Sequence, residues 1–250
     1  METETVDNHQ YAWLSQVLPR QPQRILDVGC GRGVLASELM RRGHSVTAID
    51  ISPEAVGAAR AAGVPAVQAD VVTYPDSAAD DPALVRHYDG ESLFDAVVMS
   101  LSLHHVHPLQ AALDRVRSLL RPGGLLVVDE FGWDWADLAA ATWFYDAGSL
   151  LAAAGVADVT REPGGPGRDP LERWREAHGD HTPADAMLAA LAERFQVTSM
   201  RREPYLSRYI GGKVTNGGTD VLNELWRIER DRMAAGTLPP TGFRMTARSV

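Results

Sequence analysis

Short, continuously apolar runs alternate along the chain with longer segments in which apolar residues recur every three or four positions. Runs of the first kind predict buried strands, and segments of the second kind predict helices. We expect strands at Arg24–Val28, Ser45–Asp50, Ala66–Ala69, Phe94–Met99 and Leu125–Glu130, and helices at Val34–Arg41, Pro53–Ala62 and Pro108–Leu120. This alternation predicts an α/β fold with a mostly parallel sheet and helices on both faces.

The pattern becomes helical after Phe131 and returns to strands near the C-terminus. We expect helices at Ala136–Ala154, Pro170–His178, Pro183–Arg194 and Gly218–Ala235, strands at Phe195–Leu206 and Phe243–Val250, an excursion with a short helix at Asp76–Glu91, and a loop at Gly164–Gly167. Residues 131–194 show no core of their own. We therefore expect a single domain over residues 1–250, in which 131–194 form a helical insertion.

Composition and charge narrow the class of protein. The chain has 250 residues with 45% hydrophobic and 23% charged residues, which is typical of a globular domain with a sizeable core. A formal net charge of −9 disfavours a nucleic-acid partner. Cys30 is the single cysteine, so no disulfide can form within the chain and a thiolate metal cluster is excluded. The polar N-terminus and the absence of a long apolar segment predict a cytoplasmic protein with no secretory signal and no membrane partner.

The residues Ile25–Gly33, ILDVGCGRG, combine a strand, a tight glycine turn and the start of a helix. This arrangement lets a nucleotide-like ligand approach the backbone. A dinucleotide site requires G-x-G-x-x-G, whereas the glycines here read G-x-G-x-G, which suits an adenosyl group without a pyrophosphate. Asp50 ends the second expected strand and Asp70 the third, where a carboxylate can accept ribose or adenine hydrogen bonds.

At these residues the sequence resembles the class I S-adenosylmethionine-dependent methyltransferases. Five segments resemble that family's motifs in order: ILDVGCGRG, VTAIDIS, VQADVVTYP, FDAVVMSLSLHHV and LLRPGGLLVVDEF. The paired histidines of the fourth segment are similar to those of the small-molecule methyltransferases. The resemblance implies a Rossmann-like seven-stranded sheet in the order 3-2-1-4-5-7-6 with strand 7 antiparallel. It also implies S-adenosyl-L-methionine as cofactor and S-adenosyl-L-homocysteine as product.

The resemblance implies cofactor contacts for the glycine loop. Gly29 and Gly31 would pack under the methionyl part, and Asp27 would face its ammonium. Cys30 belongs to the same cofactor-binding loop, and we expect its thiol to pack as a small apolar group and not to act as a nucleophile. Arg32 departs from the family's usual Thr, Ser or Tyr, and it would either pair with the cofactor carboxylate or point to solvent.

The resemblance also assigns the ends of the next strands. Asp50 would hold the ribose hydroxyls, and Ile51 would lie against the adenine ring. Asp70 would bind the adenine amino group, and the backbone of Val71 would reach a ring nitrogen. Ser100 would face the carboxylate side of the cofactor.

Three histidines follow the fourth expected strand, at 104, 105 and 107. Because histidine titrates near neutrality, we consider His104 and His105 as catalytic bases, while His107 is less favoured since Pro108 follows it. A structural role for one of them, holding the loop by a hydrogen bond, stays open. We expect no metal, because adjacent histidines on a short loop do not converge easily. Asp129 and Glu130 are the other candidates for a base or an acceptor-orienting group.

The methyl acceptor is expected under the helical insertion, which is rich in aromatic residues. From it we select Trp143, Tyr145 and His181 as acceptor contacts, together with Glu130. The amphipathic segment Tyr11–Leu18 predicts a helical lid within residues 1–20, where His9, Tyr11 and Trp13 would contact ligand.

The sequence thus predicts a methyltransferase that transfers a methyl group to O or N, with C as a third choice, on a small molecule. The alternatives are a non-catalytic S-adenosylmethionine-binding regulatory protein, a nicotinamide oxidoreductase, which the glycine spacing disfavours, and an RNA or protein methyltransferase. The acceptor itself stays open, as does the choice between monomer and homodimer.

Overall fold

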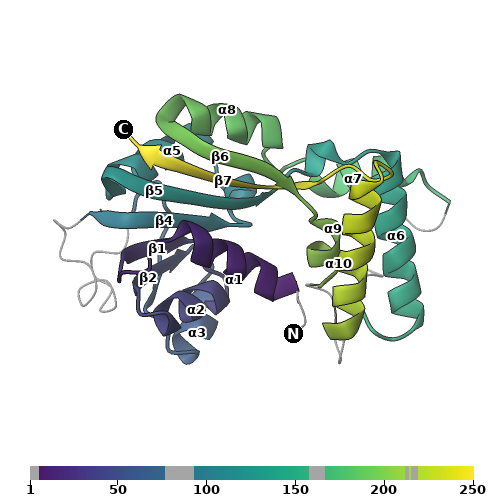
Figure 1. Ribbon diagram of the computed structural model, residues 1–250, viewed down its shortest axis with the longest axis horizontal. Helices are drawn as coiled ribbons and strands as arrows, with labels where there is room; N and C mark the ends of the chain where they lie inside the picture. The colour runs from purple at the N-terminus through teal and green to yellow at the C-terminus, as the bar shows by residue number, and fades with distance from the viewer. Residues whose placement is uncertain (1–5, 77–92, 158–166, 212–213, 215–218) are drawn as a thin grey trace. The chain divides into compact units, whose positions relative to one another are not determined.

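The structure, a computed structural model, describes residues 6–76, 93–157, 167–211, 214 and 219–250. Seven strands form one mostly parallel sheet in the order β3-β2-β1-β4-β5-β7-β6, with β7 antiparallel. The strands are β1 Arg24–Val28, β2 Ser45–Asp50, β3 Ala66–Gln68, β4 Phe94–Ser100, β5 Leu120–Phe131, β6 Phe195–Glu203 and β7 Gly242–Ser249. The fold class and the strand order implied by the family resemblance are confirmed. Figure 1 shows the strands from β2 through β1, β4, β5 and β7 to β6 in this order.

The expected helices form within a few residues of their predicted bounds. They are α1 Val6–Val17, α2 Val34–Arg41, α3 Pro53–Ala61, α5 Leu109–Leu119, α6 Leu138–Ala153, α7 Pro170–His178, α8 Ala184–Arg194 and α10 Thr219–Ala234. Side chains cap several of them, as the sequence signals indicate. Ser52 accepts a hydrogen bond from the Ala55 N–H at 3.2 Å, and Asp137 accepts one from the Ala140 N–H at 2.8 Å.

The strands are continuously apolar because the sheet is covered on both faces. Ile25, Leu26, Val97 and Leu126 are fully buried. Helices α2 and α3 pack against the neighbouring strands β2 and β3. Parallel register pairs Asp27 with Ala48 and Val28 with Ile49, so the polar residues that end β1 and β2 meet at one edge of the sheet.

Two elements depart from the prediction. Strand β5 begins at Leu120 and not at Leu125, because Leu120 pairs with Phe94 before a register shift. Strand β6 ends at Glu203, and a helix that was not predicted, α9 (Leu206–Gly211), follows. The parts of the expected Asp76–Glu91 and Gly164–Gly167 segments that fall within 77–92 and 158–166 lie outside the described residues.

The start of α9 is held by a carboxylate that is distant in sequence. Glu229 of α10 is fully buried, and it accepts the N–H groups of Tyr205 at 2.8 Å, Leu206 at 2.9 Å and Ser207 at 2.8 Å. Burial raises the pKa of Glu229. Because the cap comes from another helix, the local sequence of α9 contains no signal for it.

The chain divides into two compact units. One contains Met1–Leu14, Phe131–Ala184 and Arg202–Phe243, and the other contains Ser15–Glu130, Asp185–Arg201 and Arg244–Val250. The first unit has an aromatic cluster, in which Phe131 stacks on Tyr205 at 4.2 Å between ring centroids and Phe144 stacks on Tyr209 at 5.2 Å. The single domain, the lid and the insertion stay predictions. Within the described ranges, no helix is long and apolar enough to span a membrane.

Replacing Glu229 by Ala should destabilise the unit that contains α9 and α10. The variant leaves three N–H groups without their acceptor, which we expect to lower the free energy of unfolding by about 3 kcal/mol in urea denaturation. The control is Glu224→Ala, which removes an exposed ion pair with Arg227 on the same helix and should cost less than about 1 kcal/mol. Equal effects of the two substitutions would contradict the capping role.

Candidate functional site

A cavity of about 400 Å³ lies at the carboxyl ends of β1, β2 and β3. Its lining residues are Val28, Gly29, Gly31, Ile49, Asp50, Ile51, Ala69, Asp70, Val71, Leu101, Ser102, His105, Val106 and His107. Six of the residues selected from the sequence for cofactor binding therefore meet in one cavity. Asp27, Cys30 and Ser100 do not line it, although Asp27 directly precedes Val28 and Cys30 lies between Gly29 and Gly31, which do.

The glycine loop turns through backbone conformations that favour glycine. Gly29, Gly31 and Gly33 have φ values of 72°, 52° and 80°. A β-carbon on Gly29 would lie 2.4 Å from the Ser102 Cβ, so this position is closed by the chain itself. A β-carbon on Gly31 would meet nothing within 4 Å, so this position opens onto the cavity. The two glycines thus serve different purposes, packing and ligand access.

Asp50 holds the glycine loop against β2. Its two carboxylate oxygens accept the Gly31 N–H and the Ser52 N–H, each at 2.9 Å. This bond to Gly31 was not foreseen from the sequence. Each carboxylate oxygen has a second lone pair, so the same group can still accept hydrogen bonds from ribose hydroxyls, as the resemblance implies.

Asp27 is a buried carboxyl group with one oxygen unsatisfied. Its side chain is 2% exposed, and Oδ2 has no hydrogen-bond partner in the described part of the chain. Burial first, and then the charge of Asp50, raise the pKa of Asp27 to about 7. An unpaired carboxylate at this depth is costly, and a cationic ligand group beside it would remove that cost. The orphaned oxygen therefore fits the ammonium that the resemblance places there.

The two side chains of the glycine loop itself, Cys30 and Arg32, show no comparable fit to a cofactor group. Cys30 is buried, and burial with the charges of Asp27 and Asp50 raises its pKa to about 12. A thiol in this state is a poor nucleophile, in agreement with the expectation from the sequence. Arg32 is exposed and does not line the cavity.

The far wall of the cavity suits a flat heterocycle. Ile51 is 71% exposed, which is unusual for an isoleucine beside a cavity. Asp70 is exposed, and its Oδ1 accepts the Val72 N–H at 2.8 Å, which fixes the turn after β3. The predicted contacts of Ile51, Asp70 and Val71 with adenine are compatible with these positions.

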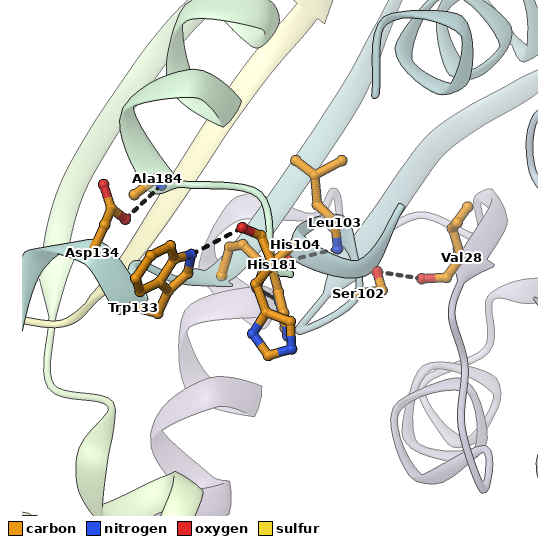
Figure 2. A network of polar contacts seen from close by, with 9 residues as sticks. Val28, Ser102, Leu103, His104, Trp133, Asp134, His181 and Ala184 are labelled. Atoms are coloured by element: carbon orange, nitrogen blue, oxygen red, sulfur yellow. Dashed lines mark hydrogen bonds and ion pairs between the residues drawn. The ribbon is translucent and has the colours of Figure 1, made fainter. Parts of the chain in front are cut away.

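The loop that follows β4 and carries His104, His105 and His107, which we call the histidine loop, is hydrogen-bonded to two strands, β1 and β5 (Figure 2). Ser102 Oγ donates to the Val28 carbonyl at 2.8 Å, which ties the loop to β1. Glu130 at the end of β5 accepts the Leu103 N–H at 2.7 Å with one oxygen, and its other oxygen lies 2.5 Å from His104 Nδ1. Leu101, with φ 54°, starts the loop in a strained conformation. The role of Ser102 was missed, because a serine with a distant carbonyl partner has no signature in sequence.

The three histidines take different positions. His104 is 5% exposed and is held by Glu130, and it does not line the cavity. His105 and His107 line the cavity, and the rings of His104 and His105 lie 4.0 Å apart. The structure thus gives His104 a carboxylate partner and places His105 in the wall of the cavity.

Of the two carboxylates at the end of β5, Asp129 has a different partner. It is buried, and its Oδ1 lies 3.3 Å from Arg244 Nε on β7. The pair joins two strands of the sheet, which indicates a structural role. Glu130, in contrast, contacts the histidine loop at Leu103 and His104.

Apart from Glu130, the residues selected for the acceptor lie in the other compact unit. Tyr145 is buried under the Arg173 guanidinium, whose Cζ is 3.7 Å from the ring centroid. The His181 carbonyl accepts the Trp133 Nε1–H at 3.1 Å (Figure 2). Trp143 lines a second cavity between α6 and α10. Trp13 is buried, while the side chains of His9 and Tyr11 lie outside the described part. The contacts of all these selected residues with an acceptor stay predictions.

Comparison with known proteins identifies the family. A family profile described as a methyltransferase domain matches residues 3–193. The chain belongs to this methyltransferase domain family. Over 119 residues it is 38% identical to a ubiquinone biosynthesis O-methyltransferase of Xylella fastidiosa, and this match covers 46% of this chain and 45% of that protein. An uncharacterized methyltransferase of Mycobacterium tuberculosis is 39% identical over 127 residues, covering 49% of this chain and 58% of that protein.

The chain thus spans about half the length of these curated relatives, whereas solved structures align over nearly the whole of this chain. An S-adenosylmethionine-dependent methyltransferase from Mesorhizobium loti has a TM-score of 0.56 at 20% identity, covering 96% of this chain and 97% of that one. The [4+2]-cyclase SpnF has a TM-score of 0.56 at 19% identity, covering 97% and 80%. At this identity the likeness shows the fold, and the class I architecture is confirmed.

Replacing Asp27 by Asn should flatten the dependence of stability on pH. The pKa of Asp27 rises from 3.8 to about 7 on folding, so between these values the unfolded chain releases a proton that the folded protein keeps. The free energy of unfolding of the unmodified protein should therefore contain a contribution that falls as the pH rises through this window, on the order of 4 kcal/mol in total. Urea denaturation between pH 4 and pH 8 measures it.

In D27N this contribution should be absent, so its stability relative to the unmodified protein should increase with pH. The control Asp220→Asn, at an exposed position on α10, should leave the pH dependence unchanged. Parallel curves for D27N and the unmodified protein would show that Asp27 titrates normally in the folded state.

Proposed function

We propose that this protein is an S-adenosylmethionine-dependent methyltransferase that acts on a hydroxyl group of a small molecule. The observation on which the proposal rests is the meeting of Gly31, the Asp50 carboxylate and the exposed Ile51 in one cavity. Asp27, whose Oδ2 has no hydrogen-bond partner among the described residues, directly precedes Val28 of the cavity wall. These groups match the ribose, adenine and ammonium of the cofactor. Membership of the methyltransferase domain family supports the same conclusion.

The roles of the binding residues follow from their chemistry. Asp50 would accept the ribose hydroxyls, Ile51 would cover the adenine, and Asp70 would accept the adenine amino group. Asp27 would pair with the ammonium, and its carboxylate form would be favoured by that charge. When bound, S-adenosyl-L-methionine supplies a methyl group on a positively charged sulfur.

An oxygen acceptor is favoured by the relatives. Those that match at 37–38% identity from Xylella fastidiosa are named ubiquinone biosynthesis O-methyltransferases. A hydroxyl group becomes a good nucleophile when a base removes its proton, and the chain provides a base of the required kind in His104. N-methylation and C-methylation are the alternatives that acceptor tests would reveal.

The pair of Glu130 and His104 is arranged as a base with an orienting carboxylate. A carboxylate at Nδ1 fixes the ring and favours the tautomer in which Nδ1 bears the proton and Nε2 can accept one. It also stabilises the imidazolium that forms when the proton is taken up. We therefore assign proton removal to His104, orientation of its ring to Glu130, and a position beside the cofactor to His105.

A non-catalytic or differently reacting protein is the second candidate, because one structure of the same fold is a [4+2]-cyclase. Isothermal titration calorimetry with S-adenosyl-L-homocysteine, followed by transfer of labelled methyl groups to small phenols and related hydroxyl compounds, separates the candidates. Binding with turnover supports the proposal. Binding without turnover on any acceptor favours the second candidate, and no binding contradicts both.

Gly31→Ala provides a sharp test of the cavity. Since a β-carbon at Gly31 would meet no atom of the described residues within 4 Å, the variant should fold with a loss of only about 1 kcal/mol from its positive φ. The same β-carbon would occupy ligand space, so we expect calorimetry to show at least about tenfold weaker binding of S-adenosyl-L-homocysteine. Full affinity in a folded G31A protein would rule out this cavity as the cofactor site.

Glu130→Gln should separate the orientation of the His104 ring from the binding of the cofactor. The variant keeps an acceptor for the Leu103 N–H but loses the charge beside His104, so kcat should fall about 10²-fold while the affinity for S-adenosyl-L-homocysteine stays within about twofold. H104Q should lose as much, and the double variant should lose little more, because the two residues act as a unit. Independent, multiplying losses would contradict the pair.

A further inference from the structure

Helix α6 (Leu138–Ala153) is apolar around most of its circumference, although one side of it lies at the surface. Ala140, Phe144 and Gly148 are buried within its own unit. On another side, Leu138 is 50% exposed and Leu150 is 71% exposed. A helix that is apolar on all sides is normally covered on all sides. This exposed side is therefore a candidate interaction surface.

Helix α10 forms the second wall of the same surface. Both α6 and α10 pack on α9 (Figure 1). Between them lies a cavity of about 790 Å³, which we call the α6/α10 groove. Its lining residues are Leu138, Ala139, Thr142, Trp143, Asp146, Ala147, Leu150, Leu151, Leu225, Ile228 and Arg232. Leu151 and Leu225 are buried, while Trp143 is half-buried.

The groove has two charged residues, of opposite sign and on opposite walls. Asp146 belongs to α6 and Arg232 to α10. Both side chains are exposed, and within the described residues neither makes an ion pair. The surface therefore combines apolar side chains, a half-buried tryptophan and one charge of each sign, which is a composition found in protein interfaces.

We propose that the α6/α10 groove is the interface of a homodimer, occupied by the same face of a second copy of this chain. In a two-fold symmetric contact each residue meets its counterpart reciprocally, so a surface must be complementary to itself. One acidic and one basic residue on opposite walls satisfy this requirement. Asp146 of each copy pairs with Arg232 of the other, and the exposed leucines and Trp143 supply the apolar contacts.

The same charges argue against an unrelated partner. A peptide with one acidic or one basic end would match only one wall and would leave the opposite charge unpaired in an apolar contact, which is unfavourable. The α6 and α10 helices of two copies instead form a four-helix contact of the kind that packs efficiently in proteins. The proposal is independent of the reaction, and its test uses no turnover.

The experiment is reciprocal charge reversal, read by light scattering coupled to size-exclusion chromatography on the full chain. The unmodified protein should be a dimer at micromolar concentration. Asp146→Arg and Arg232→Asp should each raise the dimer dissociation constant at least about a hundredfold, because each puts two like-charge contacts into the interface. The double variant D146R/R232D restores opposite charges at both contacts and should recover most of the dimer.

Two further variants keep the result interpretable. Leu150→Asp should also produce monomers, because it places a charge in the apolar part of the groove. Arg175→Asp, a charge reversal at an exposed position of α7, should leave the dimer intact. Unchanged far-UV circular dichroism and thermal unfolding of the monomeric variants would show that they fold. An unmodified protein that is monomeric at high micromolar concentration overturns the proposal, as does a dimer that resists both single charge reversals or a double variant that stays monomeric.

Discussion

The parallel pairing of β1 with β2 is the constraint on which the candidate site depends. It places the carboxyl groups of Asp27 and Asp50 at the same edge of the sheet, and the glycine loop folds over them. Asp50 accepts hydrogen bonds from backbone N–H groups, whereas Asp27 is buried with one oxygen that has no hydrogen-bond partner among the described residues. The Asp50 carboxylate therefore holds the glycine loop in place, whereas the Asp27 carboxyl group has an oxygen with which a cationic group can pair. The proposed binding of a cationic cofactor group would supply the partner that Asp27 lacks among the described residues.

The second fixed region, the histidine loop, depends on the same edge. Ser102 ties it to β1, and Glu130 ties it to β5. The close approach of Ser102 to Gly29 brings the two loops into direct contact. A change in the glycine loop should thus be transmitted to the position of His104. Family membership and the sheet order explain why such a site occurs here, while the geometry of these side chains is specific to this chain.

Much of this was predictable from sequence because the signals are local. The apolar runs, the Ser52 cap and the G-x-G-x-G spacing each depend on neighbouring residues, and the corresponding strands, helix and loop form as expected. The start of α9, the hydroxyl of Ser102 and the carboxylate of Glu130 have partners 22 to 74 residues away. Such contacts have no periodicity, so only the fold reveals them. The division into two compact units also depends on contacts between residues that are distant in sequence, because the aromatic cluster joins Phe131, before β6, to Tyr205, after it.

The central claim is that the buried carboxyl of Asp27 is completed by a cationic group of the cofactor. The most direct measurement is the proton balance of S-adenosyl-L-homocysteine binding, obtained by calorimetry at pH 6.5 in buffers of different ionisation enthalpy. With the pKa of free Asp27 near 7, pairing with an ammonium should release about half a proton or more per molecule bound. D27N should bind without this release. Equal proton release by both proteins, or none by either, would contradict the account.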